Sequence, residues 1–415
     1  MREMVDHEIF ELANGIRIVH KEVSNSKIVH CGFIFDIGSR DEKHDQSGLA
    51  HFWEHMAFKG TEHRKAIHII NRLESVGGEL NAYTTKEKIC FYASTLAQHF
   101  EKSVDLLSDI AFHSVFPERQ IENERGVILE EMSLYADAPE DAIQDDFEDL
   151  IYHGHPLGRN ILGTRSSVSS FQKKDFHNFI RENLDTSRII FSVVGNMPFA
   201  KVLKIAKKYI DALPSLSAIR TRIPVDGYIA KTKLLKKPIN QAHCAIGCTA
   251  YPLSDNRRLP FLLLSNILGG PGLNSRLNLQ MREKYGYVYS IDAQYSAYSD
   301  TGIFAIYFAT EMQKMSRCVD LVLKEFNKLK YRSLGNLQLH RAKEQFIGQM
   351  AIAEENNTNL MLMMGKSLLD MSLIETFDEV VDQINAINEI ELMEVANEIW
   401  QDDRYSFLYF IPEKK

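Results

Sequence analysis

Two histidines and a glutamate lie close together in the segment SGLAHFWEHMAFKG, which runs from residue 47 to residue 60. We predict that this segment forms one helix, with Ser47 as its N-cap and Gly60 as its C-terminal glycine. On such a helix His51 and His55 lie one turn apart on the same face, and Glu54 lies beside them. Two neutral imidazoles are the usual start of a catalytic zinc site, and a nearby carboxylate can act as the base for a metal-bound water.

A zinc site of this kind needs a third protein ligand, and a second predicted helix offers candidates. This helix has Pro117 in its first turn and ends before Pro139. One stripe of the helix places two carboxylates among apolar side chains: Ile121, Glu124, Ile128, Glu131 and Tyr135. A metal ion would stabilise one buried carboxylate, and a hydrogen bond from an imidazole would stabilise the other. We prefer Glu131 over Glu130 as the third ligand, because Glu130 lies about 100° away around the helix.

Other histidines and cysteines are alternative metal ligands. His153 and His155 lie two residues apart in a Gly-Pro turn, where we favour a folding role over a second metal site. Cys244 and Cys248 form a CxxxC pattern in a strand-like run, which puts them on one face but far apart. The five cysteines are an odd number and widely scattered, so we expect buried thiols and no disulfide framework. The HxxEH pattern by itself also fits a helix whose polar face happens to carry two histidines.

Taken together, these residues resemble the M16 (pitrilysin) family of metallopeptidases, whose motif is the inverted HxxEH. The resemblance rests on the histidine helix, on a glutamate 76 positions after the second histidine, and on the segment GGELNAYT at residues 77–84. By its length the chain is most similar to the processing-peptidase branch of the family. The resemblance implies an α+β fold of the LuxS/MPP-like metallohydrolase type: two duplicated domains, each a mostly antiparallel sheet packed with helices.

The resemblance also implies a role for each residue of the site. By position, His51, His55 and Glu131 match the zinc ligands of the family. Glu54 matches its general base. Glu124, seven residues before Glu131, matches a second acidic residue that supports the site.

Residues that would hold a substrate are found in both halves of the chain. Three residues match the edge strand on which the family lays its substrate: Asn81, Ala82 and Tyr83. An edge strand suits this task because an extended peptide can add to it through main-chain hydrogen bonds, although an ordinary hairpin is the alternative. Arg282 and Tyr289 resemble the Arg and Tyr pair with which the family contacts the peptide near the scissile bond. The residues between Gly286 and Tyr289 depart from the family pattern, so Tyr287 competes with Tyr289 for this role.

Weak internal similarity indicates a duplicated domain. The His30-Cys31 pair recurs at residues 243–244, and a Val-Asp-Leu run at 104–106 recurs at 319–321. Strand signals alternate with long amphipathic stretches in each half, which is typical of an α+β fold. We place the boundary near residue 220, between a zinc-binding peptidase domain (1–220) and a homologous domain without metal (221–415) that contributes the Arg and Tyr pair. Gln349 stands where the second copy of Glu131 would be, so we expect one Zn²⁺ per chain.

The composition excludes some classes of partner. The formal net charge is −8 and the isoelectric point is about 6.0, so no basic face is expected for nucleic acid or an anionic membrane. No apolar run reaches the roughly 18 residues that a membrane-spanning helix needs. The first residues are acidic where a secretory signal needs a basic start, so we expect a cytoplasmic protein.

We therefore predict a zinc endopeptidase that hydrolyses extended or unfolded peptides inside a chamber, with Glu54 as the general base. The long relatives close their chamber with twice this length of chain, so the resemblance implies a homodimer, or a heterodimer with an inactive paralogue. One alternative is a non-catalytic scaffold subunit of such a heterodimer. Another is an unrelated zinc hydrolase that acts on a small molecule.

Overall fold

The computed structural model describes residues 7–413, which form two compact units. The first unit contains the chain up to Met132 together with Arg159–Arg222 and Ile352–Thr376. The second unit contains Ser133–Gly158, Ile223–Ala351 and the chain from Phe377 onward. The chain passes from the first unit to the second after Arg222, near the expected boundary, but each unit also includes a segment from the other half of the sequence.

The first unit is built on a six-stranded sheet with the strand order β1-β2-β6-β3-β5-β4. Its strands are β1 (Glu8–Glu11), β2 (Arg17–Glu22), β3 (Ile28–Phe35), β4 (Glu79–Thr84), β5 (Ile89–Leu96) and β6 (Ile189–Gly195). All neighbours are antiparallel except β2 and β6, which are parallel. The sheet is therefore mostly antiparallel, and β4 and β5 form the predicted hairpin.

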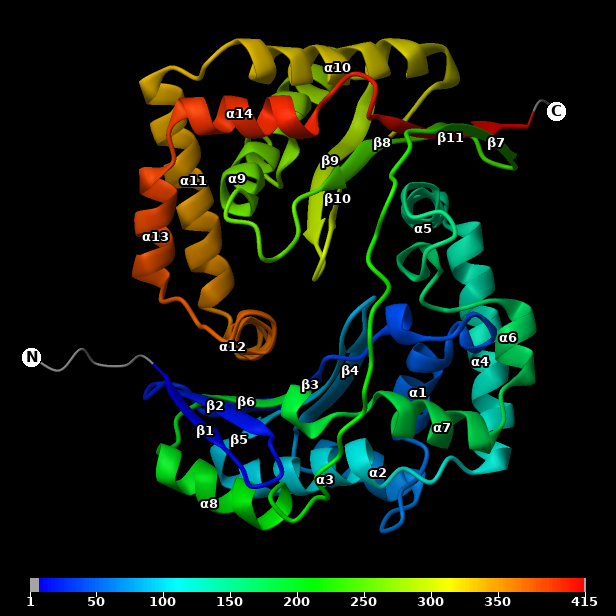
Figure 1. Ribbon diagram of the computed structural model, residues 1–415, viewed down its shortest axis with the longest axis vertical. Coiled ribbons are helices and arrows are strands. Elements are labelled where there is room, and N and C mark those ends of the chain that lie inside the picture. Colours follow the sequence, from blue (N-terminus) through cyan, green and yellow to red (C-terminus); the bar gives the residue numbers. More distant parts are fainter. Residues whose placement is uncertain (1–6, 414–415) are drawn as a thin grey trace, which may run out of the picture. The chain divides into compact units, whose positions relative to one another are not determined.

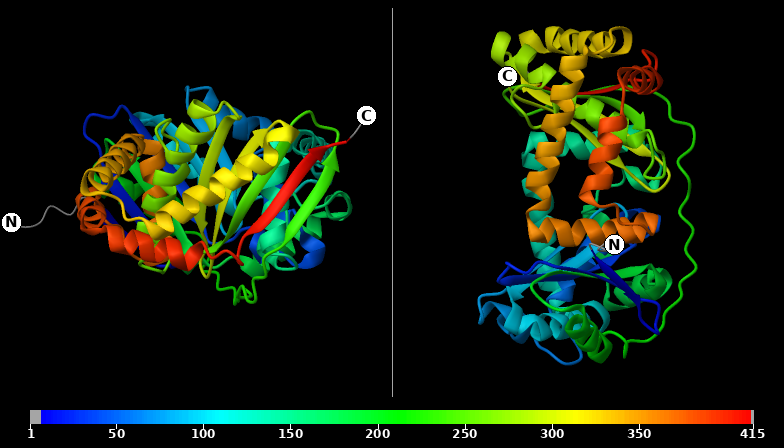
Figure 2. Two further views of the ribbon diagram at one scale, coloured as in Figure 1. Left: turned by 90° about the horizontal axis from the view of Figure 1, so that it is seen from above. Right: turned by 90° about the vertical axis from the view of Figure 1, so that its left-hand side faces the viewer.

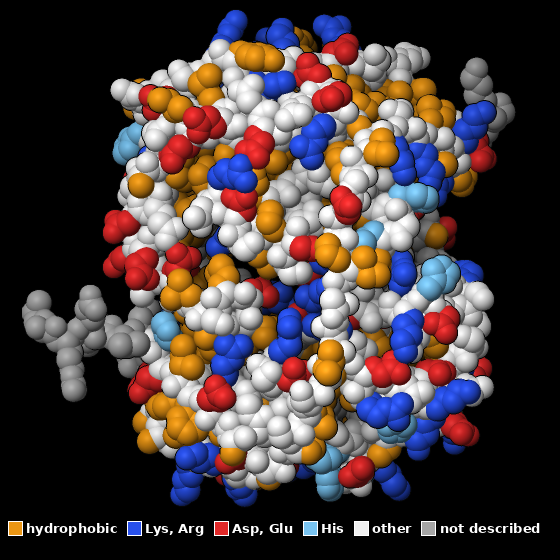
Figure 3. Space-filling model, viewed as in Figure 1, with side chains coloured by type: hydrophobic (Ala, Val, Ile, Leu, Met, Phe, Trp, Pro, Cys, Tyr) orange, Lys and Arg blue, Asp and Glu red, His pale blue; other side chains and the backbone are white. Residues whose placement is uncertain are grey.

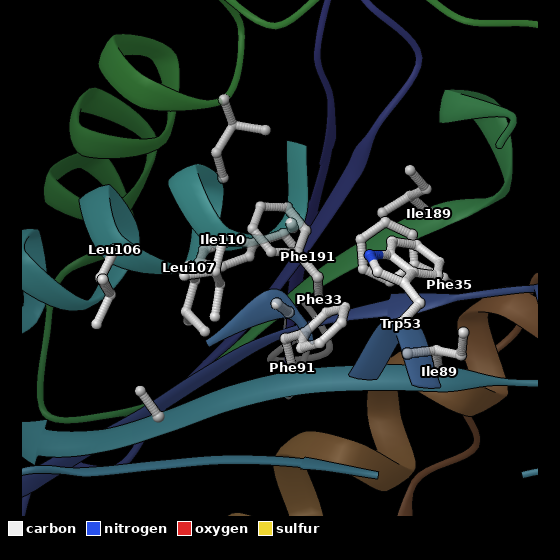
Figure 4. Packing of buried hydrophobic residues seen from close by; sticks show 14 of the residues in the cluster. Phe33, Phe35, Trp53, Ile89, Phe91, Leu106, Leu107, Ile110, Ile189 and Phe191 are labelled. Carbon is white, nitrogen blue, oxygen red and sulfur yellow. The ribbon is translucent and has the colours of Figure 1, made fainter. Parts of the chain in front are cut away.

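Helices cover one face of this sheet with an aromatic core. They are α1 (Leu49–Ala57), α2 (Ala66–Glu74), α3 (Phe100–Phe112), α4 (Glu118–Asp137), α6 (Arg165–Ser170), α7 (Lys173–Asn183) and α8 (Phe199–Tyr209). Phe33 and Phe35 point to this face because strand residues alternate between the two faces of a sheet. Figure 4 shows Trp53 of α1 packed beside Phe35. The ring centroids of these two residues lie 5.9 Å apart. The histidine helix is thus anchored to the sheet through its apolar face.

The other face of the first sheet is covered by α12 (Asn357–Met371), which comes from the second half of the sequence. Four side chains of α12 pack on Val19, Ile190 and Val194 of the sheet: Leu360, Met361, Met364 and Leu368. Figure 2 shows α12 lying across this sheet. Both faces of the sheet are therefore buried against helices.

The second unit repeats this design. Its five strands are β7 (Thr232–Lys237), β8 (Ala242–Ala250), β9 (Val288–Ala297), β10 (Gly302–Thr310) and β11 (Ser406–Pro412), in the order β7-β11-β8-β10-β9. The parallel pair β7 and β11 corresponds to β2 and β6, and the β9–β10 hairpin corresponds to the β4–β5 hairpin. This shared topology confirms the predicted α+β fold with two duplicated sheets.

Helices from both halves of the sequence also cover the second sheet. On one side lie α9 (Arg258–Gly269), α10 (Met315–Tyr331), α11 (Asn336–Glu354), α13 (Phe377–Ala386) and α14 (Glu389–Ile399). The opposite face packs against α5 (Pro139–Ile151), which comes from the first half of the sequence (Figure 1). The two halves thus exchange one helix each, α5 for α12. A single cut near residue 220 consequently does not separate the two packing units.

The visible face carries charges of both signs, and the cysteines are buried. Figure 3 shows acidic and basic side chains mixed over the visible face. No helix among residues 7–413 is long and apolar enough to cross a membrane. All five cysteines are buried free thiols, as predicted.

Candidate active site

Helix α1 begins in a way that the sequence did not predict. Its N-cap is Gly48, which adopts a left-handed backbone with φ of 94°, and Ser47 precedes it. The carboxyl group of Glu42 takes the place of a capping side chain, because its oxygens accept hydrogen bonds from the backbone N–H groups of Gly48 at 2.9 Å and Ala50 at 2.8 Å. The helix ends at Ala57, before Gly60. Both the Ser47 cap and the Gly60 end were therefore wrong, although the helix itself is present.

The structure brings His51, His55 and Glu131 together, with one ligand atom of each within 4.8 Å of the others. The Nε2 atom of His51 lies 3.8 Å from Oε1 of Glu131, and Nε2 of His55 lies 3.6 Å from Oε2 of the same carboxylate. These separations exceed hydrogen-bond length. They suit a shared ion, since two ligand atoms about 2.1 Å from a tetrahedral zinc lie about 3.4 Å apart. The donor set therefore fits zinc.

The burial of these groups also suits a metal. Burial lowers the pKa of His51 to about 3, and the neighbouring His55 adds to this effect, so the His51 imidazole is neutral at pH 7. Burial raises the pKa of Glu131, and His55 opposes the rise. A cation beside Glu131 would favour its ionised form. Glu130, the alternative ligand, is exposed to solvent.

Glu124 lies next to Nδ1 of His55, the ring nitrogen that does not face Glu131. Its side chain is only 10% exposed, and its Oε2 lies 3.3 Å from Nδ1 of His55. The ammonium group of Lys59 lies 2.7 Å from its Oε1. Burial opposes ionisation of Glu124, but the hydrogen bonds from His55 and Lys59 outweigh it and lower the pKa of this carboxyl. Glu124 thus presents an ionised carboxylate to the second histidine.

Glu54 projects from α1 toward the end of the edge strand β4. The hydroxyl of Thr84 donates a hydrogen bond of 2.7 Å to its Oε2. Burial raises the pKa of Glu54, and the charge of Glu131 adds to the rise, while the hydrogen bonds from Thr84 oppose it. A carboxylate whose pKa is moved up toward neutrality is suited to exchange protons with water.

The strand β4 has one edge that pairs with β5, and no strand within residues 7–413 pairs with its other edge. Asn81 is exposed on this strand, and Ala82 and Tyr83 are partly buried. The ammonium group of Lys366 lies 5.0 Å from the centre of the Tyr83 ring. An unpaired edge next to Glu54 offers main-chain groups to an extended peptide.

Arg282 and Tyr289 lie in the second unit and contact each other. Arg282 belongs to a π-helical segment, η6 (Asn278–Lys284), and its guanidinium lies 5.7 Å from the centre of the Tyr289 ring. Tyr289 is 88% exposed. Tyr287 instead stacks on Tyr285 with ring centroids 5.2 Å apart. Tyr289 is therefore the more accessible partner of Arg282, and its role toward a substrate stays a prediction.

The second half lacks a matching metal set. On α9 and α11, the counterparts of α1 and α4, the amide of Asn266 donates a hydrogen bond of 2.8 Å to the side-chain oxygen of Gln349. His155 has a structural contact, because its Nε2 lies 2.9 Å from the carbonyl oxygen of Ile223. Within residues 7–413, the one group of three metal-ligating side chains in reach of a common ion is His51, His55 and Glu131.

Three polar residues near the site were not singled out from the sequence: Glu42, Lys59 and Thr84. Thr84 was part of the segment that carried the resemblance, and its hydroxyl at a strand end was a usable signal. Lys59 lies four residues after His55, but the helix ends before it, so helical spacing did not predict its contact. Glu42 lies in an irregular segment with no periodic pattern that would place it.

Comparison with known proteins identifies the class of this fold and site. The model described as "Insulinase (Peptidase family M16)" matches residues 17–165, and the model described as "Peptidase M16 inactive domain" matches residues 170–346. The chain is 30% identical over 390 residues to the uncharacterized zinc protease YmxG of Bacillus subtilis (strain 168), covering 94% of this chain and 95% of that protein. It is 28% identical over 404 residues to the beta subunit of the mitochondrial-processing peptidase of Saccharomyces cerevisiae, covering 93% and 87%.

Solved structures share the same fold. A peptidase M16 inactive domain from Pseudomonas fluorescens superposes with a TM-score of 0.92 at 17% identity, covering 99% of both chains. A protease from Helicobacter pylori superposes with a TM-score of 0.90 at 21% identity, covering 98% of this chain and 99% of the other. Fold and donor set thus define a metallopeptidase architecture. The chain belongs to peptidase family M16, and its named relatives imply zinc as the metal.

Proposed function

We propose that the protein is a zinc-dependent endopeptidase that hydrolyses extended or unfolded peptides, with one zinc ion per chain. The observation that carries the proposal is one cluster: three metal donors within reach of a common ion, beside a carboxylate that is hydrogen-bonded to the end of an unpaired strand edge. The donors are His51, His55 and Glu131, and the carboxylate is Glu54. Metal ligands, a base and a peptide-binding edge are three parts that metal-assisted hydrolysis of an extended peptide would use.

When bound, zinc polarises the scissile carbonyl and lowers the pKa of a coordinated water to about 7. Glu54 would act as the base that takes a proton from the attacking water and passes it to the leaving amine. The hydroxyl of Thr84 holds Oε2 of Glu54, which leaves Oε1 to carry the proton. Glu124 holds His55 through Nδ1, so that Nε2 faces Glu131 and the ion.

The proposed substrate is a peptide without stable structure. Such a peptide can extend along β4 next to Asn81, Ala82 and Tyr83 and form main-chain hydrogen bonds that do not depend on its sequence. Arg282 and Tyr289 bind the peptide and stabilise the developing oxyanion. Their contribution requires a closed chamber, which we propose is completed by a second chain, either another copy of this protein or an inactive paralogue.

The complete donor set favours this function over a non-catalytic subunit. A scaffold would need neither the three donors nor a base whose pKa is raised by burial. A hydrolase of small molecules would have no use for an unpaired strand edge beside the base.

The test is zinc content and cleavage of an unstructured, internally quenched peptide. Glu54→Gln should retain about one zinc per chain and lower kcat by about 10²–10⁴-fold, since the base is lost and the ligands remain. Glu131→Gln should lose zinc as well as activity. Glu130→Gln is the matched control, because Glu130 is the exposed neighbour of Glu131 and its loss should change neither quantity. Near wild-type kcat for Glu54→Gln would show that the base is misassigned.

A further inference from the structure

A lysine lies at the end of a chain of contacts that leads to the metal-facing atom of His55. The Nζ atom of Lys59 lies 2.7 Å from Oε1 of Glu124. The other oxygen of that carboxylate lies 3.3 Å from Nδ1 of His55. The remaining ring nitrogen of His55, Nε2, lies 3.6 Å from Glu131 across the proposed ion site. The three groups therefore run in series from the lysine to the ion site.

The backbone places Lys59 firmly for this contact. Helix α1 ends at Ala57, and the N–H of Lys59 donates a hydrogen bond of 3.0 Å to the carbonyl of Met56. The side chain of Lys59 is 29% exposed, whereas that of Glu124 is 10% exposed. A charged hydrogen bond at this degree of burial is stronger than one in water. The ammonium group therefore restrains the position of the carboxylate.

The restraint has a chemical consequence for His55. A carboxylate only accepts hydrogen bonds, and one oxygen of Glu124 is already engaged by Lys59. The other oxygen then accepts from Nδ1–H of His55, which is the tautomer that leaves a lone pair on Nε2. Orientation of a metal-binding histidine by a second partner of this kind is a general feature of zinc sites.

The two histidines differ in this respect. The Nδ1 atom of His51 is buried and has no hydrogen-bond partner among the described residues. The His51 ring is buried and lies against the His55 ring, with centroids 4.6 Å apart, but no side chain within residues 7–413 accepts a hydrogen bond from its Nδ1. The half-buried His55 is held at Nδ1 by Glu124, which Lys59 contacts. Removal of the Lys59 side chain should therefore loosen the orientation of His55 and leave His51 and Glu131 in place.

We infer that Lys59 is a positioning residue of the metal site, which acts through Glu124 to orient His55 for zinc. The inference rests on the proposed zinc site. Lys59 would contact neither the ion nor the substrate. Loss of the direct partner of a metal-binding histidine, here Glu124, lowers metal affinity by about 10–100-fold in zinc proteins, and this range is the upper bound for Lys59, which acts one contact further out.

The experiment measures the zinc dissociation constant of the full-length protein by competition with a fluorescent zinc chelator. Lys59→Met, which keeps the aliphatic stem and removes the charge, should weaken zinc binding by about tenfold, and by no more than the roughly 10–100-fold expected for loss of Glu124. Lys59→Arg should restore most of the affinity, because a guanidinium can also engage the carboxylate. Lys65→Met is the matched control, since Lys65 is an exposed lysine six residues later. The melting temperature of each zinc-free variant shows whether it is folded.

A double variant separates positioning from a general structural effect. Because Lys59 acts through Glu124, Lys59→Met combined with Glu124→Gln should bind zinc no more weakly than Glu124→Gln alone. Losses that multiply would overturn the inference. So would wild-type affinity in Lys59→Met.

A second readout does not depend on zinc. In the zinc-free protein, ¹⁵N NMR of labelled histidines, assigned by comparison with His55→Ala, should show His55 with its proton on Nδ1 in the wild type. In Lys59→Met, His55 should be a mixture of the tautomer protonated on Nδ1 and the tautomer protonated on Nε2. An unchanged tautomer would refute the role of Lys59. Failure of the wild type to bind zinc would refute the proposed function, whereas normal zinc binding with an unchanged tautomer and affinity in Lys59→Met would refute the inference alone.

Discussion

Helix α12 lies close to the first sheet at Gly365, and this close packing predicts the effect of a single methyl group. A Cβ at Gly365 would lie 2.4 Å from Cδ1 of Ile34 and 3.2 Å from Cβ of Ser192. Ile34 is fully buried, so its side chain has little room to move. The change Gly365→Ala therefore forces α12 away from the sheet or Ile34 from its rotamer.

The expected magnitude follows from two opposing terms. Replacing glycine by alanine inside a helix stabilises it by about 1 kcal/mol. Overpacking a buried contact costs about 1–3 kcal/mol. Gly126, inside α4 of the same unit, is the matched control, because a Cβ there would meet no atom within 4 Å. Gly126→Ala should raise the free energy of unfolding above that of the wild type. The free energy of unfolding of Gly365→Ala should be about 1–3 kcal/mol lower than that of Gly126→Ala.

The two tryptophans provide the assay. Trp53 lies in the first unit and Trp400 in the second, and both are fully buried. In a Trp400→Phe background the fluorescence of Trp53 reports urea unfolding of the first unit alone. The midpoint should rise for Gly126→Ala and be lower for Gly365→Ala, with equal slopes. If Gly365→Ala were as stable as Gly126→Ala, α12 would not approach the sheet as described.

Three further predictions concern the site and the assembly. Burial raises the pKa of Glu42 to about 8 from its ordinary 4.5, against two backbone hydrogen bonds from α1, so the folded state holds an extra proton between these values. As the pH rises from 6 to 9, through the folded pKa, the wild type should therefore lose up to about 3 kcal/mol of unfolding free energy, measured by urea titration. Glu42→Gln should lack this loss. If the unfolding free energies of both proteins fell equally with pH, the prediction would be refuted. Thr84→Val removes a hydrogen bond to Glu54 worth about 1.5 kcal/mol, so kcat should fall about tenfold with zinc content unchanged; an unchanged kcat would exclude this role. In a homodimer with shared sites, freely exchanging equal mixtures of inactive His55→Ala and Arg282→Ala chains should recover about a quarter of wild-type activity, and no recovery despite proven exchange would refute shared sites.

The exchange of helices was not accessible from the sequence. The amphipathic pattern of α5 and α12 predicts that each helix buries an apolar face, but not on which sheet. In the structure Leu360 and Met364 of α12 pack on the first sheet, although α12 comes after β10 of the second sheet in the sequence. The choice depends on contacts between segments far apart in sequence, which local periodicity does not encode.

Much of the candidate metal site, by contrast, could be predicted from the sequence. His51 and His55 share one helix, so their spacing alone places both imidazoles on one face. Glu131 comes from another helix, and its position in an apolar stripe distinguished it from Glu130, which the structure leaves exposed. The same stripe was wrong at Tyr135, which is 42% exposed, because α4 passes from the first unit to the second after Met132.

The amino-acid sequence by itself determined the features that depend on regular spacing. These are the two imidazoles one turn apart, the carboxylate on the apolar stripe of a second helix, and strand pairs that form hairpins. The tertiary structure alone decided the contacts that irregular segments make, which have no repeating geometry to read. Glu42 rather than Ser47 caps α1, and the hydroxyl of Thr84 holds Glu54. Lys59 reaches Glu124 from beyond the end of its helix. Each of these contacts joins groups that come together only after the chain has packed.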